Sequence, residues 1–233
     1  MEQWIEGFGW YVAFLVSVTC HEASHALAAL KLGDRTAYNH GQVTLDPVPH
    51  IQREPWGMVI IPVLSFVMGG WMMGWGSAPY DPRWAMDYPK RSAAMAFAGP
   101  CANLMIVIVS GLLIRLGLWI GLFDAPATIT FIRTVIPASG QNLAGVAGFL
   151  SILFTLNIIL LFFNLLPVPP LDGSAFPLLF LSRQAAQTYL TWMSHPAGFW
   201  IGIVVAWRVF DVVFPPLHTL ALNILYLGIA QYG

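Results

Sequence analysis

The sequence predicts an all-α polytopic membrane protein with about five to six transmembrane helices and a short re-entrant or β-hairpin element. Hydrophobic residues make up 58% of the 233 residues and charged residues only 9%, whereas a soluble domain carries about 25% charged residues. The apolar residues also run in long stretches, which match the roughly 20 helical residues that cross a bilayer. The net charge of −1 provides no basic surface for nucleic acid.

The first apolar segment covers about residues 7–32, which is long enough to cross a membrane at about 1.5 Å per residue. Glu2 and Glu6 stand before it, where a secretory signal would carry Lys or Arg. The segment is therefore expected to remain as a membrane helix. A polar stretch follows, residues 34–55, in which Val43 and Leu45 alternate between Gly and Pro and predict a short strand or hairpin.

The remaining apolar segments differ in how often Gly and Pro interrupt them. The second segment contains Pro62 and several glycines, so it can cross the membrane or re-enter it, provided that protein or water covers its backbone. Pro215 and Pro216 are expected to separate the last two segments. The segments after the first cover about residues 56–75, 92–118, 143–166, 197–214 and 217–232.

Residues His21 and His25 lie near the end of the first segment, in the sequence His-Glu-Ala-Ser-His. Two His at positions i and i+4 share one face of a helix and can hold one zinc ion. Glu22 can then reach a zinc-bound water as a general base. The alternative is an ordinary pair of helical His, but ionisable residues inside apolar spans are costly and usually functional.

A catalytic zinc ion usually has three protein ligands, so a third is expected. Asp172 is the best candidate, because it follows the Pro-rich break after the fourth segment. An Asp-Gly pair is equally typical of a plain turn, and both interpretations stay open. Asp211 is the rival, although an ion pair with Arg208 three residues earlier explains it more simply.

Two amides in apolar segments need hydrogen-bond partners. Asn164 is expected to join helices. Asn103 either does the same or supports the site, for example as a donor to a developing oxyanion. Interfacial or solvated positions are expected for the four other His: His40, His50, His195 and His218.

Three motifs together resemble the site-2 protease family of intramembrane zinc metalloproteases. They are the His21–His25 motif, Gly-Pro-x-x-Asn at residues 99–103, and Asn-x-x-Pro-x-Pro-x-Leu-Asp-Gly at residues 164–173. The resemblance covers about residues 10–175 and fits the compact subgroup without PDZ or CBS domains. It implies that His21, His25 and Asp172 bind one Zn²⁺ per chain. It also implies that Glu22 and Asn103 are catalytic, Glu22 as the general base and Asn103 beside the active site.

The resemblance further implies one integral-membrane metalloprotease domain over residues 1–233. Its catalytic core is expected at about residues 7–175, with C-terminal helices at about 176–233. Residues 74–82 resemble the family's re-entrant strand region near the active site, which lines the substrate. Ser77 stands where the subgroup often has Lys.

The expected activity is hydrolysis of peptide bonds within or near transmembrane helices of membrane-protein substrates, as in regulated intramembrane proteolysis. The alternatives are a non-catalytic membrane zinc-binding protein and an ion transporter, but a transporter should show internal repeats and none is visible. The expected partners are a transmembrane substrate and the lipid bilayer, with no nucleic acid; the sequence leaves the oligomeric state open.

Basic residues predict the orientation in the membrane. If the second segment re-enters, six Lys and Arg fall on one side of the membrane. The positive-inside rule then places that side in the cytoplasm. The protein is accordingly expected in a prokaryotic inner or plasma membrane, with its N-terminus outside and its active site toward the cytoplasm. The six basic residues are Lys31, Arg35, Arg53, Arg83, Lys90 and Arg91.

Overall fold

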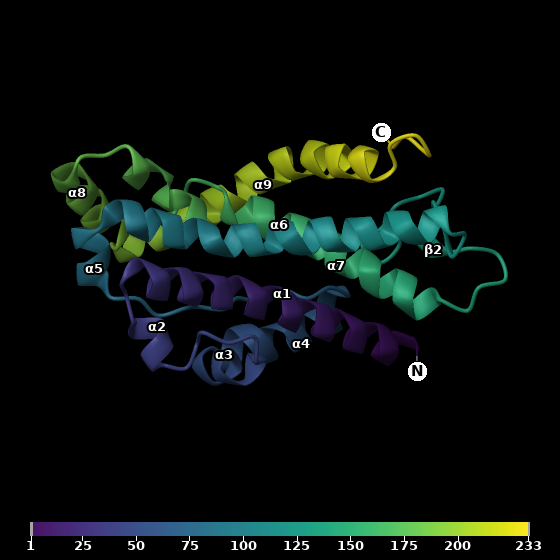
Figure 1. Cartoon of the computed structure of the whole chain (residues 1–233), viewed down its shortest axis with the longest axis horizontal. Helices are drawn as coiled ribbons and strands as arrows, with labels where there is room; N and C mark the ends of the chain where they lie inside the picture. Colours follow the sequence, from purple (N-terminus) through teal and green to yellow (C-terminus); the bar gives the residue numbers. More distant parts are fainter. Residues whose placement is uncertain (1, 233) are drawn as a thin grey trace.

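The structure, a computed structural model, describes residues 2–232 and is built almost entirely from helices (Figure 1). Four long helices form its body, and shorter elements connect them. The long helices are α1 (Glu2–Leu32), α6 (Pro89–Trp119), α7 (Ala144–Asn164) and α9 (Pro196–Leu225). The short elements are α2 (Thr36–Asn39), α3 (Pro47–Arg53), the π-helical turn η1 (Trp56–Ile60), α4 (Ile61–Gly69), α5 (Pro82–Asp87), the 3₁₀ helix η2 (Asp172–Leu179) and α8 (Arg183–Met193).

Within residues 2–232, the four long helices are the ones long and apolar enough to cross a membrane, fewer than the predicted five to six. One reason is α9, which runs unbroken through Pro215 and Pro216 and so joins the last two predicted segments. Membrane helices tolerate internal Pro where local adjustments satisfy the freed backbone groups. The other reason is that η1 and α4 together cover only residues 56–69, about 21 Å of helix against a hydrocarbon core of about 30 Å.

Helix α1 packs between α4 and α7. Trp10 and Phe14 of α1 are almost fully buried in one apolar cluster with Phe66 of α4 and Ile152 of α7. A second cluster joins α6, α7 and the end of α9 at the opposite side of the bundle. The first cluster thus packs α1 against α4 and α7, and the second packs α6 against α7. In contrast, only 11% of the most apolar stretch of α9 is buried.

The predicted strand or hairpin around Val43 and Leu45 is wrong, because residues 41–46 form turns and bends. The segment instead leads into α3 and caps its N-terminus. Asp46 caps this helix by accepting a hydrogen bond from the backbone N–H of Val48 at 2.9 Å, and Pro47 takes the first helical position. The sheet of the described residues lies elsewhere, where β1 (Phe123–Asp124) pairs antiparallel with β2 (Ile136–Pro137) in the α6–α7 connection.

Residues 34–81 leave α1 and return to the same end of it. The backbone N–H of Asp81 donates to the Asp34 carboxylate at 2.8 Å, and that of Trp75 donates to the carbonyl of Gly57 at 3.1 Å. After α4, the chain runs back as an extended segment alongside α1 (Figure 1). The predicted re-entrant element is therefore a short helix followed by an extended return.

Asp34 is buried where this return ends. Burial alone raises the pKa of its carboxyl, but hydrogen bonds from the hydroxyl and backbone N–H of Thr36 and from the backbone of Asp81 outweigh burial and lower that pKa. The charged carboxylate thus joins the end of α1 to the end of the extended segment.

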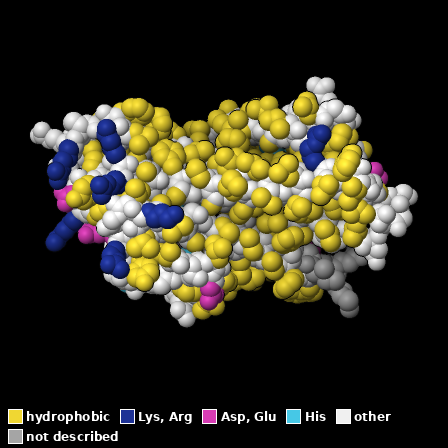
Figure 2. Space-filling view, in the orientation of Figure 1, with side chains coloured by type: hydrophobic (Ala, Val, Ile, Leu, Met, Phe, Trp, Pro, Cys, Tyr) yellow, Lys and Arg dark blue, Asp and Glu magenta, His cyan; other side chains and the backbone are white. Residues whose placement is uncertain are grey.

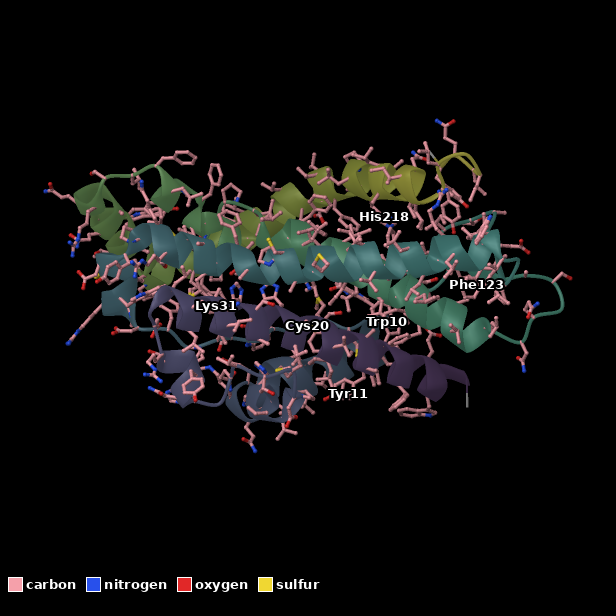
Figure 3. The ribbon with its side chains drawn as sticks, viewed as in Figure 1. Trp10, Tyr11, Cys20, Lys31, Phe123 and His218 are labelled. Atoms are coloured by element: carbon pink, nitrogen blue, oxygen red, sulfur yellow. The ribbon has the colours of Figure 1, made fainter. Side chains whose placement is uncertain are left out.

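Basic side chains gather at one end of the molecule, where α2, α5 and α8 lie, and apolar side chains cover its middle (Figure 2). The sticks show the same polarity along α1, with Lys31 toward this end, Cys20 next and Trp10 toward the other end (Figure 3). All six Lys and Arg that the sequence assigned to one side are exposed. The exposed Arg183 at the start of α8 joins them.

Candidate metal centre

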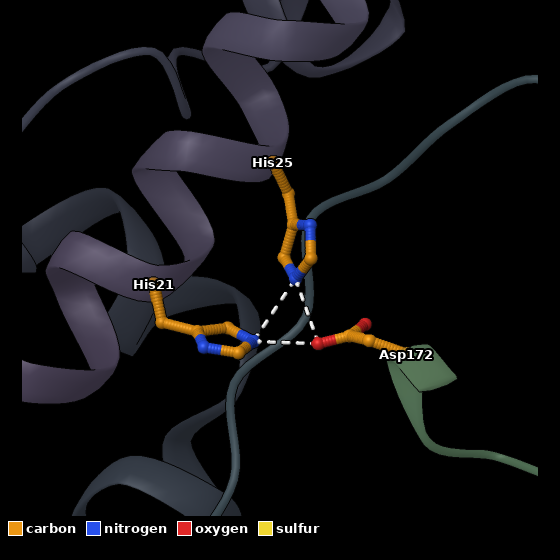
Figure 4. A group of neighbouring side chains, drawn as sticks. All are labelled: His21, His25 and Asp172. Atoms are coloured by element: carbon orange, nitrogen blue, oxygen red, sulfur yellow. Dashed lines mark hydrogen bonds and ion pairs between the residues drawn. The ribbon is translucent and has the colours of Figure 1, made fainter. Parts of the chain in front are cut away.

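Three side chains from two distant parts of the chain converge (Figure 4). They lie beside Gly99 of α6. His21 and His25 are one helical turn apart on α1, and Asp172 is the first residue of η2. The two imidazole Nε2 atoms are 2.9 Å apart. The Oδ2 atom of Asp172 lies 3.1 Å from Nε2 of His21 and 3.3 Å from Nε2 of His25.

The hydrogen bonds of the other ring nitrogens assign both imidazole tautomers. Nδ1 of His25 lies 2.8 Å from the carbonyl oxygen of Met95, which can only accept, so this Nδ1 carries the hydrogen. Nδ1 of His21 lies 2.6 Å from Oδ1 of Asn103, whose Nδ2 donates to Asn157 at 2.8 Å. Both imidazoles therefore present the lone pair of Nε2 to the centre of the group.

This donor set fits a divalent metal ion. Three electron-rich atoms face one another, and the buried Oδ2 of Asp172 has no hydrogen-bond donor among the described residues. Such atoms repel one another unless a cation lies between them. Ligands about 2.0–2.1 Å from a tetrahedral zinc ion lie about 3.3 Å apart, close to the three observed separations. Two His and one carboxylate are also a ligand set of catalytic zinc sites.

Two glycines make the approach of these side chains possible. A Cβ atom added to Gly99 of α6 would overlap Nε2 of both imidazoles and lie 2.6 Å from Cε1 of His21. A Cβ atom at Gly173 would overlap the backbone of Leu165 at the end of α7. Gly99 thus lets α6 pass beside the imidazoles, and Gly173 lets the turn at Asp172 pack tightly on α7.

Glu22 lies beside this group and is only 6% exposed. A Cβ atom at Gly76 would lie 2.6 Å from its Cγ and 3.0 Å from its Oε1. The extended segment that contains Gly76 therefore runs directly over Glu22. A buried carboxylate, a pair of imidazoles and an extended backbone meet in one place.

Several predicted residues lie away from this group. Asp211 is exposed on α9, and the expected ion pair with Arg208 is absent from the ion pairs of residues 2–232. His50 is 1% exposed and hydrogen-bonds the carbonyl of Thr44, so the expectation of an interfacial or solvated side chain is wrong. Asn164 bonds the carbonyl of Leu160 in its own helix instead of joining two helices.

Sequence reasoning missed Asn157 and Ser17. The amide of Asn157 accepts from Asn103 and donates to Ser17 Oγ at 2.8 Å, so it connects α6, α7 and α1 behind His21. Asn157 is fully buried. Its position seven residues before Asn164 puts both amides on one side of α7, and this spacing was the signal available in the sequence.

Comparison with known proteins identifies the family of this chain. The profile of Peptidase family M50 matches residues 10–205. "Putative zinc metalloprotease YwhC" of Bacillus subtilis (strain 168) is 33% identical over 70% of this chain and 64% of its own length. "Putative zinc metalloprotease Rip2" of Mycobacterium tuberculosis (strain ATCC 25618 / H37Rv) is 34% identical over 72% of this chain and 53% of its own. The chain thus spans about half to two thirds of the curated relatives it matches. No solved structure matches it.

Proposed function

Because this chain belongs to peptidase family M50, we propose that it is an intramembrane zinc metalloprotease of the HExxH type. It hydrolyses peptide bonds within or near the transmembrane helices of membrane-protein substrates, as in regulated intramembrane proteolysis. The observation that carries the proposal is the convergence of Asp172 from η2 on His21 and His25 of α1, a helix long and apolar enough to cross a membrane, with all three ligand atoms within 4.8 Å of one another. The zinc metalloprotease names of the relatives support the same chemistry.

In this proposal His21, His25 and Asp172 hold one zinc ion per chain. A bound zinc ion makes water acidic enough to lose a proton near neutral pH and polarises the scissile carbonyl. Asn103 and the carbonyl of Met95 keep the two Nε2 lone pairs free to bind it, because each accepts a hydrogen bond from Nδ1.

Glu22 acts as the general base, which takes the proton of the attacking water and later delivers it to the leaving amine. Its burial beside the group favours this assignment. Asn103 acts as a positioning residue for His21. Its Nδ2 already donates to Asn157, so the amide has less capacity to donate to a developing oxyanion, the other role considered for it.

The substrate strand is proposed to lie along residues 74–82. A transmembrane helix hides its amides in internal hydrogen bonds, so it must unwind before its backbone can be cut. The segment over Glu22 is extended and belongs to no sheet in the described structure. Such a segment can hold an unwound peptide by strand addition.

We propose that residues 1–233 form one metalloprotease domain with its catalytic core at about residues 7–175. The end of the molecule that contains α2, α5 and α8 is rich in exposed basic side chains, which supports its location in the cytoplasm (Figure 2). The active site is then proposed to open toward the cytoplasm. The bacterial relatives support a prokaryotic inner or plasma membrane.

The test uses the full chain in lipid nanodiscs with a tagged single-span substrate. The Glu22→Gln variant should keep the zinc content of the wild-type protein and lose cleavage. His21→Ala should lose both. If Glu22→Gln still cleaves, Glu22 is not the base; if the wild-type protein holds zinc and cleaves none of a panel of single-span substrates, a non-catalytic zinc protein is the better description.

A further inference from the structure

Two charged residues lie in the middle of α9. Arg208 is twelve residues after the start of the helix and seventeen before its end, about 18 Å and about 25 Å along the axis. Neither end is within reach of its side chain. Arg208 and Asp211 are both exposed, so within a bilayer they face the hydrocarbon. Ionisable groups at this depth are rare and almost always face a partner or a water-filled cavity.

Neither charge has such a partner among residues 2–232. No ion pair or side-chain hydrogen bond of residues 2–232 involves Arg208 or Asp211. The opposite side of α9 makes its contacts with the protein. A Cβ atom at Gly202 would overlap the backbone of Pro169, and Phe210 packs edge-to-face on Phe163 of α7 at a centroid distance of 5.4 Å. The two charges therefore lie on the outward face.

The rest of that face is apolar and exposed. A helix rotates about 100° per residue, so residues three, four and seven positions away from Arg208 share its face. Ile201 is 64% exposed, Val204 63% and Val212 74%. Arg208 and Asp211 thus form one charged island within an otherwise aliphatic strip. Lipid can cover the aliphatic side chains, but it offers no partner to the charges.

We propose that this face of α9 is the contact between two copies of this chain. Copies in one membrane share their orientation, so a twofold axis along the membrane normal makes their α9 helices parallel. Arg208 and Asp211 lie about 60° apart around the helix and about 4.5 Å apart along it. The twofold axis is placed next to the part of the helix surface that lies between Arg208 and Asp211. In that arrangement, Arg208 of each copy lies opposite Asp211 of the other.

The charge pattern is what selects a second copy as the occupant. A twofold interface requires a surface that is complementary to itself. One Arg and one Asp, adjacent on the face and unpaired within the described part of the chain, meet that requirement with two reciprocal ion pairs. A different parallel helix would need its own Arg and Asp at the same spacing and in the same order. The contact leaves the group around His21 untouched, so it is independent of the proposed function.

The experiment exchanges the charges and measures the mass of the full chain in lipid nanodiscs and in mild detergent. The wild-type chain should be a dimer. Arg208→Asp and Asp211→Arg should each weaken the dimer by about tenfold or more. An equimolar mixture of these two variants, with different tags, should form heterodimers, because each Asp pair then meets an Arg pair. The double exchange, Arg208→Asp with Asp211→Arg, should dimerise like the wild-type chain.

Two further variants serve as controls. Arg208→Leu inserts into lipid more readily than a new carboxylate and should also weaken the dimer. Lys90→Asp changes the same charge at the exposed start of α6 and should leave it intact. A monomeric wild-type chain overturns the proposal. The proposal is equally overturned if the chain is monomeric and uses this face to bind a different protein. So does a dimer that both single exchanges leave unchanged, or a mixture that gives no heterodimer.

Discussion

Gly99→Ala should greatly weaken zinc binding although it adds a single methyl group. The new Cβ would lie 2.6 Å from Cε1 of His21 and closer still to both Nε2 atoms. Ordinary contact begins at 3.4 Å, so the imidazole must move by at least 0.8 Å. Metal ligands tolerate deviations of only about 0.2 Å. The ring has no free direction, because Asn103 and Met95 hold the opposite nitrogens of the two imidazoles at 2.6 and 2.8 Å.

The expected loss is about 100-fold or more in zinc affinity and in cleavage, since a displacement of about 1 Å at a catalytic group costs about 100-fold. Zinc content and competition with a chelator measure the first, and cleavage of a single-span substrate measures the second. Gly111→Ala is the matched control on the same helix, because its Cβ would meet the movable ring of Phe154 at 3.3 Å. Circular dichroism of the zinc-free proteins separates a local effect from a loss of fold. Wild-type zinc affinity in Gly99→Ala would refute the reasoning.

Three other perturbations follow from the same contacts. Asn157→Ala should lower zinc affinity by about 10- to 100-fold through the support of His21, measured by chelator competition. Asn164→Ala, which removes a partly buried amide of the same helix, should leave zinc affinity unchanged. Asp34→Asn removes the acceptor of the Asp81 N–H and should lower the free energy of unfolding by about 1–3 kcal/mol at pH 7. Because the folded pKa of Asp34 is lowered, wild-type stability should fall as pH drops below about 4, and a denaturation series should show a weaker fall in Asp34→Asn. Removal of zinc by a chelator should lower the melting temperature. Free zinc at 100 times its dissociation constant should then raise the free energy of unfolding by about 2.7 kcal/mol.

The spacing of His21 and His25 placed both imidazoles on one face of a helix, because that signal is local. The residues around Asp172 fitted a ligand and a plain turn equally, and only the resemblance pointed to Asp172; the structure brings its carboxylate to the two imidazoles. Asn157 was missed although it supports His21, because a single amide in an apolar helix says nothing about which distant side chain it will meet. Such a partner depends on how α1, α6 and α7 pack.

The wrong expectations share a physical cause, because each treated a local signal as decisive. Pro215 and Pro216 were read as a boundary, yet α9 continues through both. Val43 and Leu45 alternate as a strand would, but the Asp46 cap commits the following residues to α3. Arg208 and Asp211 stand at the spacing of a helical ion pair and yet do not form one.

The most direct test of the account is the position of the metal. Anomalous scattering from crystals of the zinc-loaded full chain, recorded on both sides of the zinc absorption edge, locates the ion independently of the protein model. The account predicts one zinc ion per chain, at about 2.0–2.2 Å from Nε2 of His21, Nε2 of His25 and a carboxylate oxygen of Asp172. An ion bound elsewhere, or one that binds both imidazoles with Asp172 turned away, would contradict it.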